Sequence, residues 1–203
     1  MKFEELDNRL EKVLTESGQE GYTERQQKLI KLSKQGKNQL IFTPFDQEII
    51  DGLHFISFMR APEMLEGSPR VIWITPNWES AREKVQSFHR LMKRTDVTIE
   101  IADDKGKIIE QRNAIFEGAE IIIGNPKRLL ELYNQNGIHV NQLSLIIIDQ
   151  AETLCTNPIT LQSIKRIAES LPKCQKIIFT EGTHSRLDSF CEDICTFYET
   201  SEI

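Results

Sequence analysis

Several common functional signatures are scarce or missing in this sequence of 203 residues. It has only four cysteines and no Cys-x-x-Cys pair, so neither a zinc site nor the disulfide framework of a secreted domain is expected. No run of consecutive apolar residues approaches the ~20 that a membrane-spanning helix needs, and no signal peptide opens the chain. These absences predict a soluble, cytoplasmic protein that requires no metal.

The chain also lacks an excess of positive charge. Lys and Arg number 25 against 31 Asp and Glu, a net charge of −6, which argues against binding polyanions through bulk charge. The charge is unevenly spread, because residues 25–37 carry five cations and no acid, whereas residues 181–203 carry six acids and one arginine. The basic segment is typical of a solvated helix face. Nucleic-acid binding, if present, is therefore expected from a local basic surface.

What the sequence does contain is a regular alternation of short apolar runs with longer helical patterns. Two helices are predicted at residues 3–17 and 23–35, and later ones at 78–93, 107–117, 126–134 and 160–170. Predicted strands occupy residues 39–43, 71–75, 97–101, 121–123, 145–148, 176–179 and 196–198. Several are apolar at every position, which is typical of strands covered on both faces. The pattern predicts one α/β domain over residues 1–203, with a mostly parallel sheet of about seven strands and helices on both faces.

The segments that follow the predicted strands carry the candidate chemistry, because ligands of parallel sheets bind beyond the carboxyl ends of the strands. None of these loops places a histidine beside a serine or cysteine nucleophile, and none is a glycine-rich phosphate cradle. In chain order they read TPFDQE, TPNWES, ADDKGK, GNPKRL, DQAETL and TEGTHS.

In this order and spacing, the loops resemble the amino-terminal RecA-like domain of DEAD-box RNA helicases over essentially the whole chain. Residues 1–36 resemble the helical Q-motif region of that family, which reads adenine, through Phe3, Gly18, Thr23 and Gln26. Pro76, Glu79 and Ala81 resemble motif Ia, and residues 124–129 (GNPKRL) resemble the GTPGRL element. Asp149-Gln150-Ala151-Glu152 stands in place of DEAD. The resemblance implies a three-layer RecA-like fold, with ATP and Mg²⁺ as cofactors and RNA as partner.

The phosphate loop departs from the family pattern. Counted from Gly36, it should occupy residues 43–50, which read TPFDQEII. A phosphate loop needs glycines whose N–H groups cradle the β-phosphate, a lysine for charge and a hydroxyl for Mg²⁺. Here Asp46 and Glu48 replace the glycines, Ile49 the lysine and Ile50 the hydroxyl residue. The two carboxylates should repel a triphosphate, so no cofactor is expected, and Asp46 should instead cap a helix that begins beside it.

Other departures affect catalysis. Gln150 replaces the glutamate that polarises the attacking water in the family, and an amide is a poor base. Asp149 could meet Mg²⁺, but we expect it to cap the following segment instead. Thr180-Glu181-Gly182 stands where the family carries SAT, and the second RecA-like domain is not part of this sequence. No catalytic residue is therefore expected at the altered positions Ile49, Asp149, Gln150 and Glu152.

Two partial sites remain. Phe3, Thr23 and Gln26 could keep a vestigial adenine contact, although Gln26 is better explained as a brace for the neighbouring loop and Phe3 as a core residue. The nucleic-acid face retains more of its pattern: a helix that starts after a strand favours phosphate at its N-terminus, and an aromatic side chain offers a stacking surface. The candidate residues are Pro76, Trp78, Gly124, Asn125, Lys127 and Arg128.

Three functions follow from these features. The favoured hypothesis is a degenerate, non-catalytic DEAD-box domain that binds single-stranded RNA or a ribonucleoprotein weakly. The first alternative is a protein-interaction module in which the acidic C-terminal region and the altered loops hold a partner. The second alternative is an ATP-dependent RNA helicase domain, which the phosphate loop argues against.

Overall fold

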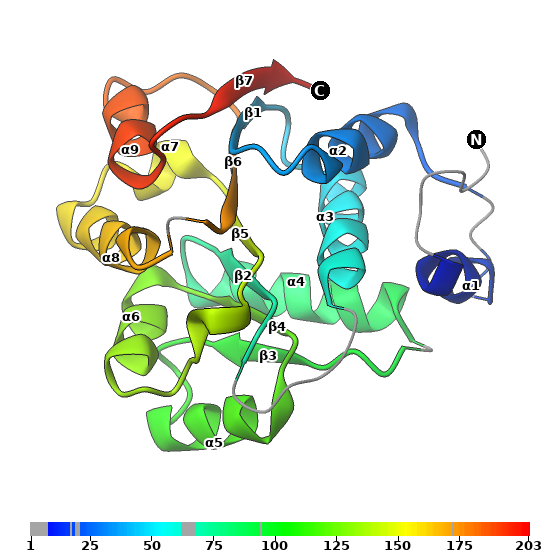
Figure 1. Cartoon of the computed structure of the whole chain (residues 1–203), viewed down its shortest axis with the longest axis horizontal. Helices are drawn as coiled ribbons and strands as arrows, with labels where there is room; N and C mark the ends of the chain where they lie inside the picture. The colour runs from blue at the N-terminus through cyan, green and yellow to red at the C-terminus, as the bar shows by residue number, and fades with distance from the viewer. Residues whose placement is uncertain (1–7, 17, 19–20, 62–67, 94, 172) are drawn as a thin grey trace.

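The computed structural model describes the chain apart from residues 1–7, 17, 19–20, 62–67, 94 and 172 (Figure 1). The described residues form one sheet of seven strands in the order β3-β4-β2-β5-β6-β1-β7, and every pairing is parallel. The strands are β1 (Gln39–Phe42), β2 (Val71–Ile74), β3 (Ile99–Ala102), β4 (Ile121–Gly124), β5 (Leu145–Ile148), β6 (Gln175–Thr180) and β7 (Glu199–Glu202).

Helices cover both faces of the sheet (Figure 1). One face packs against α1 (Asn8–Glu16), α2 (Glu24–Lys34), α3 (Gln47–Arg60) and α4 (Trp78–Leu91). The other packs against α5 (Ile108–Gly118), α6 (Pro126–Asn134), α7 (Ala151–Leu154), α8 (Pro158–Glu169) and α9 (Leu187–Ile194), and a short 3₁₀ turn (Val140–Gln142) precedes β5.

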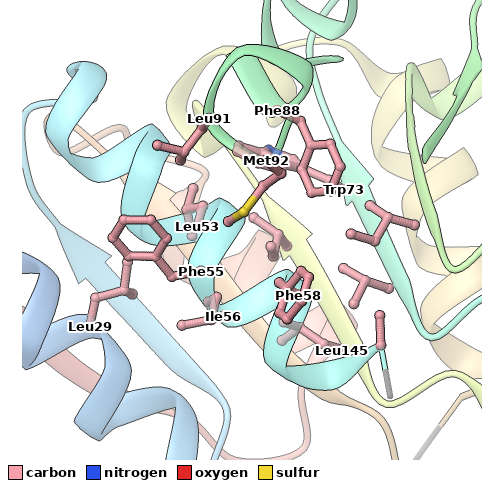
Figure 2. Close-up of a cluster of buried hydrophobic side chains, with 14 of the residues drawn as sticks. Leu29, Leu53, Phe55, Ile56, Phe58, Trp73, Phe88, Leu91, Met92 and Leu145 are labelled. Atoms are coloured by element: carbon pink, nitrogen blue, oxygen red, sulfur yellow. The ribbon is translucent and has the colours of Figure 1, made fainter. Parts of the chain in front are cut away.

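Alternate residues of the same strands enter two separate cores. On β2, Val71 and Trp73 belong to the core under α3 and α4, whereas Ile72 and Ile74 belong to the core under α5 to α9. Figure 2 shows Trp73 among side chains from α2, α3 and α4. This alternation explains why the strands are apolar at every position, since neither face of the sheet meets water.

The expected architecture is confirmed, including burial of residues 121–123, 145–148 and 176–179 in parallel strands. The last strand was misplaced: residues 196–198 were expected to form it, but β7 starts at Glu199 and its exposed residues are polar. An edge strand has one neighbour and water on its other side, so it carries no continuous apolar run that a sequence pattern could reveal.

The edge strand β3 and its neighbour β4 approach closely at their carboxyl ends, and this close approach requires glycine at position 124. A Cβ atom on Gly124 would lie 2.2 Å from the backbone oxygen of Ala102, its partner on β3. We expect Gly124→Ala to lower the free energy of unfolding by about 1–3 kcal/mol, measured by chemical denaturation, because backbone must move to admit the methyl group. Gly182→Ala is the matched control, since its Cβ would meet nothing within 4 Å. Equal stability of the two variants would contradict this account.

Candidate nucleotide site and nucleic-acid interface

The loop at the phosphate position is closed by its own side chains. Asp46 is the N-cap of α3, and its Oδ1 accepts a hydrogen bond of 3.1 Å from the backbone N–H of Ile49. The predicted cap is therefore confirmed. A carboxylate of the protein occupies the positive end of the helix, where backbone N–H groups would otherwise be available to an anion.

Arg25 of α2 binds this loop through four hydrogen bonds. Its guanidinium donates to Asp46 Oδ2 (2.7 Å), Glu48 Oε2 (3.0 Å), Thr43 Oγ1 (2.7 Å) and the Pro44 carbonyl (2.9 Å). Burial opposes the charged forms of Arg25 and Asp46, but the hydrogen bonds between them outweigh it, so the pKa of Arg25 is raised and that of Asp46 is lowered. The loop is thus an internal ion-pair network rather than a pair of unpaired carboxylates.

Thr23 and Gln26, the residues that resemble the Q motif, serve as structural support. Thr23 and Gln26 form a reciprocal capping box at the start of α2, and Gln26 Nε2 donates to the Glu48 carbonyl at 3.0 Å. The Thr23 hydroxyl also donates to the Glu48 carboxylate. Gln26 is buried and braces the altered loop, as the second of the two sequence interpretations expected. Phe3 lies outside the described residues.

Asp149 does not cap the next helix, which corrects the sequence prediction. Its side chain is fully buried, and Oδ2 accepts from the Trp73 indole N–H at 3.1 Å and pairs with Lys84 Nζ at 3.1 Å. The N-cap of α7 is Gln150, which makes no side-chain cap hydrogen bond. The carboxylate turns inward because α4 places a lysine, itself only 3% exposed, under the end of β5.

The Lys84–Asp149 pair lies in the core, where some buried polar atoms lack a hydrogen-bond partner. Burial raises the pKa of Asp149 to about 6, despite the opposing attraction of Lys84 and the hydrogen bonds from Lys84 and Trp73. Asp149 Oδ1 and both ring nitrogens of the buried His54 have no hydrogen-bond partner among the described residues. Burial first, and then the charges of Lys84 and Arg90, lower the pKa of His54 to about 3. A divalent metal does not fit here, because a lysine ammonium already holds the carboxylate.

The residues in place of DEAD and SAT contact each other at the ends of β5 and β6. The Thr180 hydroxyl donates to Glu152 Oε2 at 2.8 Å. Gln150 has a left-handed backbone with φ of 50°, which is uncommon for a residue other than glycine. Glu181 accepts from the Phe45 N–H at 2.9 Å and so links this region to the altered loop. Strand ends that were separate in the sequence therefore form one connected network.

The start of α6 carries the clearest of the predicted nucleic-acid residues. Asn125 caps the helix by accepting from the Arg128 N–H at 3.0 Å, and Pro126 is its first residue. Arg128 is buried, and its guanidinium donates to Glu131, to the Gly106 carbonyl and to Gln111. Lys127 is exposed. Arg128 thus positions the loop of residues 103–107, and Lys127 is the cation that faces solvent here.

Trp78 lies at the start of α4, next to the same loop. Asn77 caps α4, and Pro76 and Trp78 are partly exposed. The ammonium of Lys105 lies 5.6 Å from the centre of a Trp78 ring. Pro76, Trp78, Gly124, Asn125, Lys127 and Arg128 therefore all belong to the carboxyl ends of β2 and β4, and the 103–107 loop after β3 lies beside them.

Sequence reasoning missed the roles of Arg25 and Lys84, the cations that pair with Asp46, Glu48 and Asp149. Arg25 belongs to the basic segment of residues 25–37, for which the sequence predicts a solvated helix face. In the sequence, the pairing of Arg25 with the loop is suggested only by the contrast in charge between the basic segment 25–37 and the acidic residues of the loop at 43–50. Nothing in the sequence singles out Lys84.

Within the residues that the structure describes, no cluster of three or more His, Cys, Asp or Glu side chains is arranged to hold a metal ion. Over those same residues, no helix is both long enough and apolar enough to cross a membrane.

The sequence of this chain is similar to those of DEAD-box RNA helicases. A family model described as DEAD/DEAH box helicase matches residues 35–186. The DEAD-box ATP-dependent RNA helicase CshA of Streptococcus pneumoniae is 25% identical over 188 residues, which cover 90% of this chain and 35% of CshA. The ATP-dependent RNA helicase dbp3 of Schizosaccharomyces pombe is 25% identical over 121 residues, which cover 60% of this chain and 21% of that protein. The chain therefore spans about a third or less of the length of these relatives.

Solved structures show the same fold. A DEAD box protein from Methanococcus jannaschii superposes with a TM-score of 0.84 at 16% identity, covering all of this chain and 56% of that one. Yeast Dbp5 bound to RNA and ADP BeF3 superposes with a TM-score of 0.80 at 17% identity, covering all of this chain and 52% of that one.

Proposed function

The chain belongs to the DEAD/DEAH box helicase family, and we propose that it is a degenerate member domain that neither binds ATP–Mg²⁺ tightly nor hydrolyses ATP, and that binds single-stranded RNA weakly. The proposal concerns this domain, since the chain matches only part of the relatives' length.

The observation that carries the proposal is the occupied phosphate loop. Asp46 takes the α3 N-terminus, and Arg25 binds both carboxylates of the loop. For a triphosphate to enter, the Asp46 cap and the four hydrogen bonds from Arg25 would have to break. Because the loop carries two carboxylates and Arg25 only one positive charge, one negative charge would still face the phosphates. The Arg25–Asp46 and Arg25–Glu48 pairs are partly exposed, so each contributes about 0.2–1 kcal/mol, and breaking all of these contacts at once is unfavourable.

The metal and water positions are altered as well. Asp149 is buried and pairs with Lys84 rather than facing solvent, and Gln150 offers an amide in place of a carboxylate base. Gln26 is engaged by Thr23 and Glu48. Any adenine contact through Gln26 would therefore compete with these bonds, and we expect it to be millimolar at best.

Weak RNA binding is supported by the residues at the starts of α4 and α6. Lys127 is exposed at the first turn of α6, where the helix dipole favours phosphate, and Trp78 is partly exposed nearby. The yeast Dbp5 structure, which has the same fold, was solved with RNA. Because Arg128 is committed to the 103–107 loop, fewer cations are available for phosphates, so the affinity should be low and should fall only moderately as salt is added.

The decisive measurement is thermal unfolding and calorimetry with ATP–Mg²⁺, on the wild type and on Gln150→Glu. We expect 1 mM ATP–Mg²⁺ to stabilise either protein by less than about 0.5 kcal/mol, whereas a micromolar site would give about 4 kcal/mol. Gln150→Glu should release no phosphate, because restoring the base does not restore the loop. Micromolar binding by the wild type, or turnover by the variant, would revive the ATP-dependent helicase function.

A protein-interaction role is the second candidate, and Phe197 favours it. This side chain is 83% exposed within the acidic C-terminal region, whose six acids outnumber one arginine. Yeast Dbp5, a structural neighbour, was solved bound to Nup159 and Gle1. Co-purification with and without nuclease separates the two functions: a partner that survives nuclease and depends on Phe197 supports this one, and nuclease-sensitive recovery of RNA supports the first.

A further inference from the structure

A groove of about 530 Å³ crosses the edge of the sheet at β3. The end of α4 that begins at Trp78 forms one wall, the 103–107 loop and the start of α5 form the other, and Ile101 of β3 contributes to its base. This volume lies within the range of ordinary small-ligand sites, roughly 300–1,000 Å³. The groove is separate from the altered phosphate loop, which follows β1 near the other edge of the sheet.

The groove combines an aromatic surface with cations. Lys105 lies over Trp78, and Arg82, one helical turn after Trp78, is exposed on the same wall. Among the described residues, Arg82 has no hydrogen-bond or ion-pair partner. Val85 and Ile101 supply the apolar part of the lining. A flat aromatic ring flanked by exposed cations suits a ligand that is both flat and anionic.

The acids of the groove are already engaged. Asp103 accepts from the backbone N–H groups of Lys105 and Gly106, and Glu110 pairs with Lys107 at 2.8 Å. The loop is further held by Arg128, which donates to the Gly106 carbonyl, and by Gln111, which donates to the Asp103 carbonyl. The wall that carries Lys105 is therefore built in advance. The lining has three cations, Arg82, Lys105 and Lys107, against the two acids Asp103 and Glu110, so its net charge is positive.

We propose that this groove binds an unpaired base of single-stranded RNA, which stacks on Trp78 while Arg82 and Lys105 contact the flanking phosphates. This inference rests on the proposed RNA binding and adds how the strand is held. A cation–π contact at an exposed site is weak, so a base can displace Lys105 from the ring and leave its ammonium for a phosphate. Stacking tolerates any base, so the site reads single-strandedness rather than sequence.

The test uses the two tryptophans of the chain, because Trp73 is fully buried in the core and only Trp78 can meet a base. Tryptophan fluorescence is followed while the protein is titrated with a short oligouridylate and with an abasic ribose-phosphate strand of the same length. We expect oligouridylate to quench fluorescence and the abasic strand to bind about 5- to 100-fold more weakly.

Three variants identify the contact. Trp78→Ala should lose the preference for oligouridylate over the abasic strand. Trp78→Phe should keep that preference in a polarisation assay yet lose the quenching, which assigns the signal to Trp78. Lys127→Ala should weaken both strands by a similar factor and reduce the salt dependence, as a phosphate contact does. Thermal unfolding confirms that each variant is folded.

The outcomes separate this inference from the proposed function. Equal affinity for oligouridylate and the abasic strand, or quenching that persists in Trp78→Phe, overturns base stacking while RNA binding stands. Failure of the wild type to bind either strand at low salt overturns both. An acidic peptide that binds the groove and outcompetes oligouridylate would also overturn the inference, by showing that the groove serves a protein.

Discussion

Replacing Lys84 with methionine should lower the free energy of unfolding at pH 7 by about 3–5 kcal/mol, because it leaves the buried carboxylate of Asp149 without its cation. Methionine has a similar length, so the change removes charge more than volume. The Asp149 side chain is fully buried and would keep only the Trp73 indole as a polar partner. Chemical denaturation monitored by circular dichroism measures the loss.

Two controls make this result specific to the buried pair. The double variant Lys84→Met with Asp149→Asn should recover much of the lost stability, because both charges are then removed and the residues are coupled. Lys37→Met breaks a pair with Glu199 whose side chains are 60% and 49% exposed, and it should cost less than about 1 kcal/mol. If Lys84→Met were no more destabilising than Lys37→Met, the buried ion pair would not contribute to stability as expected.

Replacing His54 with leucine should make the protein less sensitive to acid. The pKa of His54 is lowered from 6.5 to about 3 in the folded state, chiefly by burial, so only the unfolded chain takes up this proton between those values. The unfolded state then binds more protons, and the stability contributed by neutral His54 is lost as the pH falls. Relative to wild type, His54→Leu should gain about 3 kcal/mol between pH 7 and pH 4.

The comparison with wild type is needed because Asp149 acts in the opposite direction. Its raised pKa, about 6, means that the folded state binds the extra proton there, so acid favours the folded protein through this group. Wild type and His54→Leu both contain Asp149, so subtracting one free energy of unfolding from the other removes most of the contribution of Asp149. His139→Leu is the matched control, because His139 is an exposed histidine. A His54→Leu difference that does not change with pH would show that His54 is not held neutral.

These buried groups bear on the proposed function because they lie under the loop of residues 43–50. Lys84 contacts Asp149, approaches the Phe45 ring of the altered loop at 5.2 Å, and bonds Ser80 at 2.6 Å. Phe45 in turn packs against Phe179 of β6. The loop, the strand ends and the core are therefore connected. The single substitution Gln150→Glu would leave all of these contacts in place.

The sequence by itself determined the sheet, the family and the Asp46 cap of α3. Strands that are apolar at every position, such as residues 145–148, have one favourable environment, a parallel sheet covered on both faces. The Asp46 cap could be predicted for a similar reason, since a cap depends on the three residues that follow it. These features were predictable because each is decided by residues close together in the chain.

The tertiary structure alone decided how charges pair. Arg25 looked like one cation of a solvated stripe, yet α2 lies beside α3 and brings it to Asp46 and Glu48. Arg128 was predicted at the nucleic-acid face, yet the neighbouring loop encloses it, and Asp149 was expected to cap a helix but turns toward Lys84. Ion pairs join residues that are far apart in sequence, and a charge gains from pairing wherever the fold brings a partner within a few ångströms. Strand order and helix placement set those distances, so the pairs could be identified only once the fold was known.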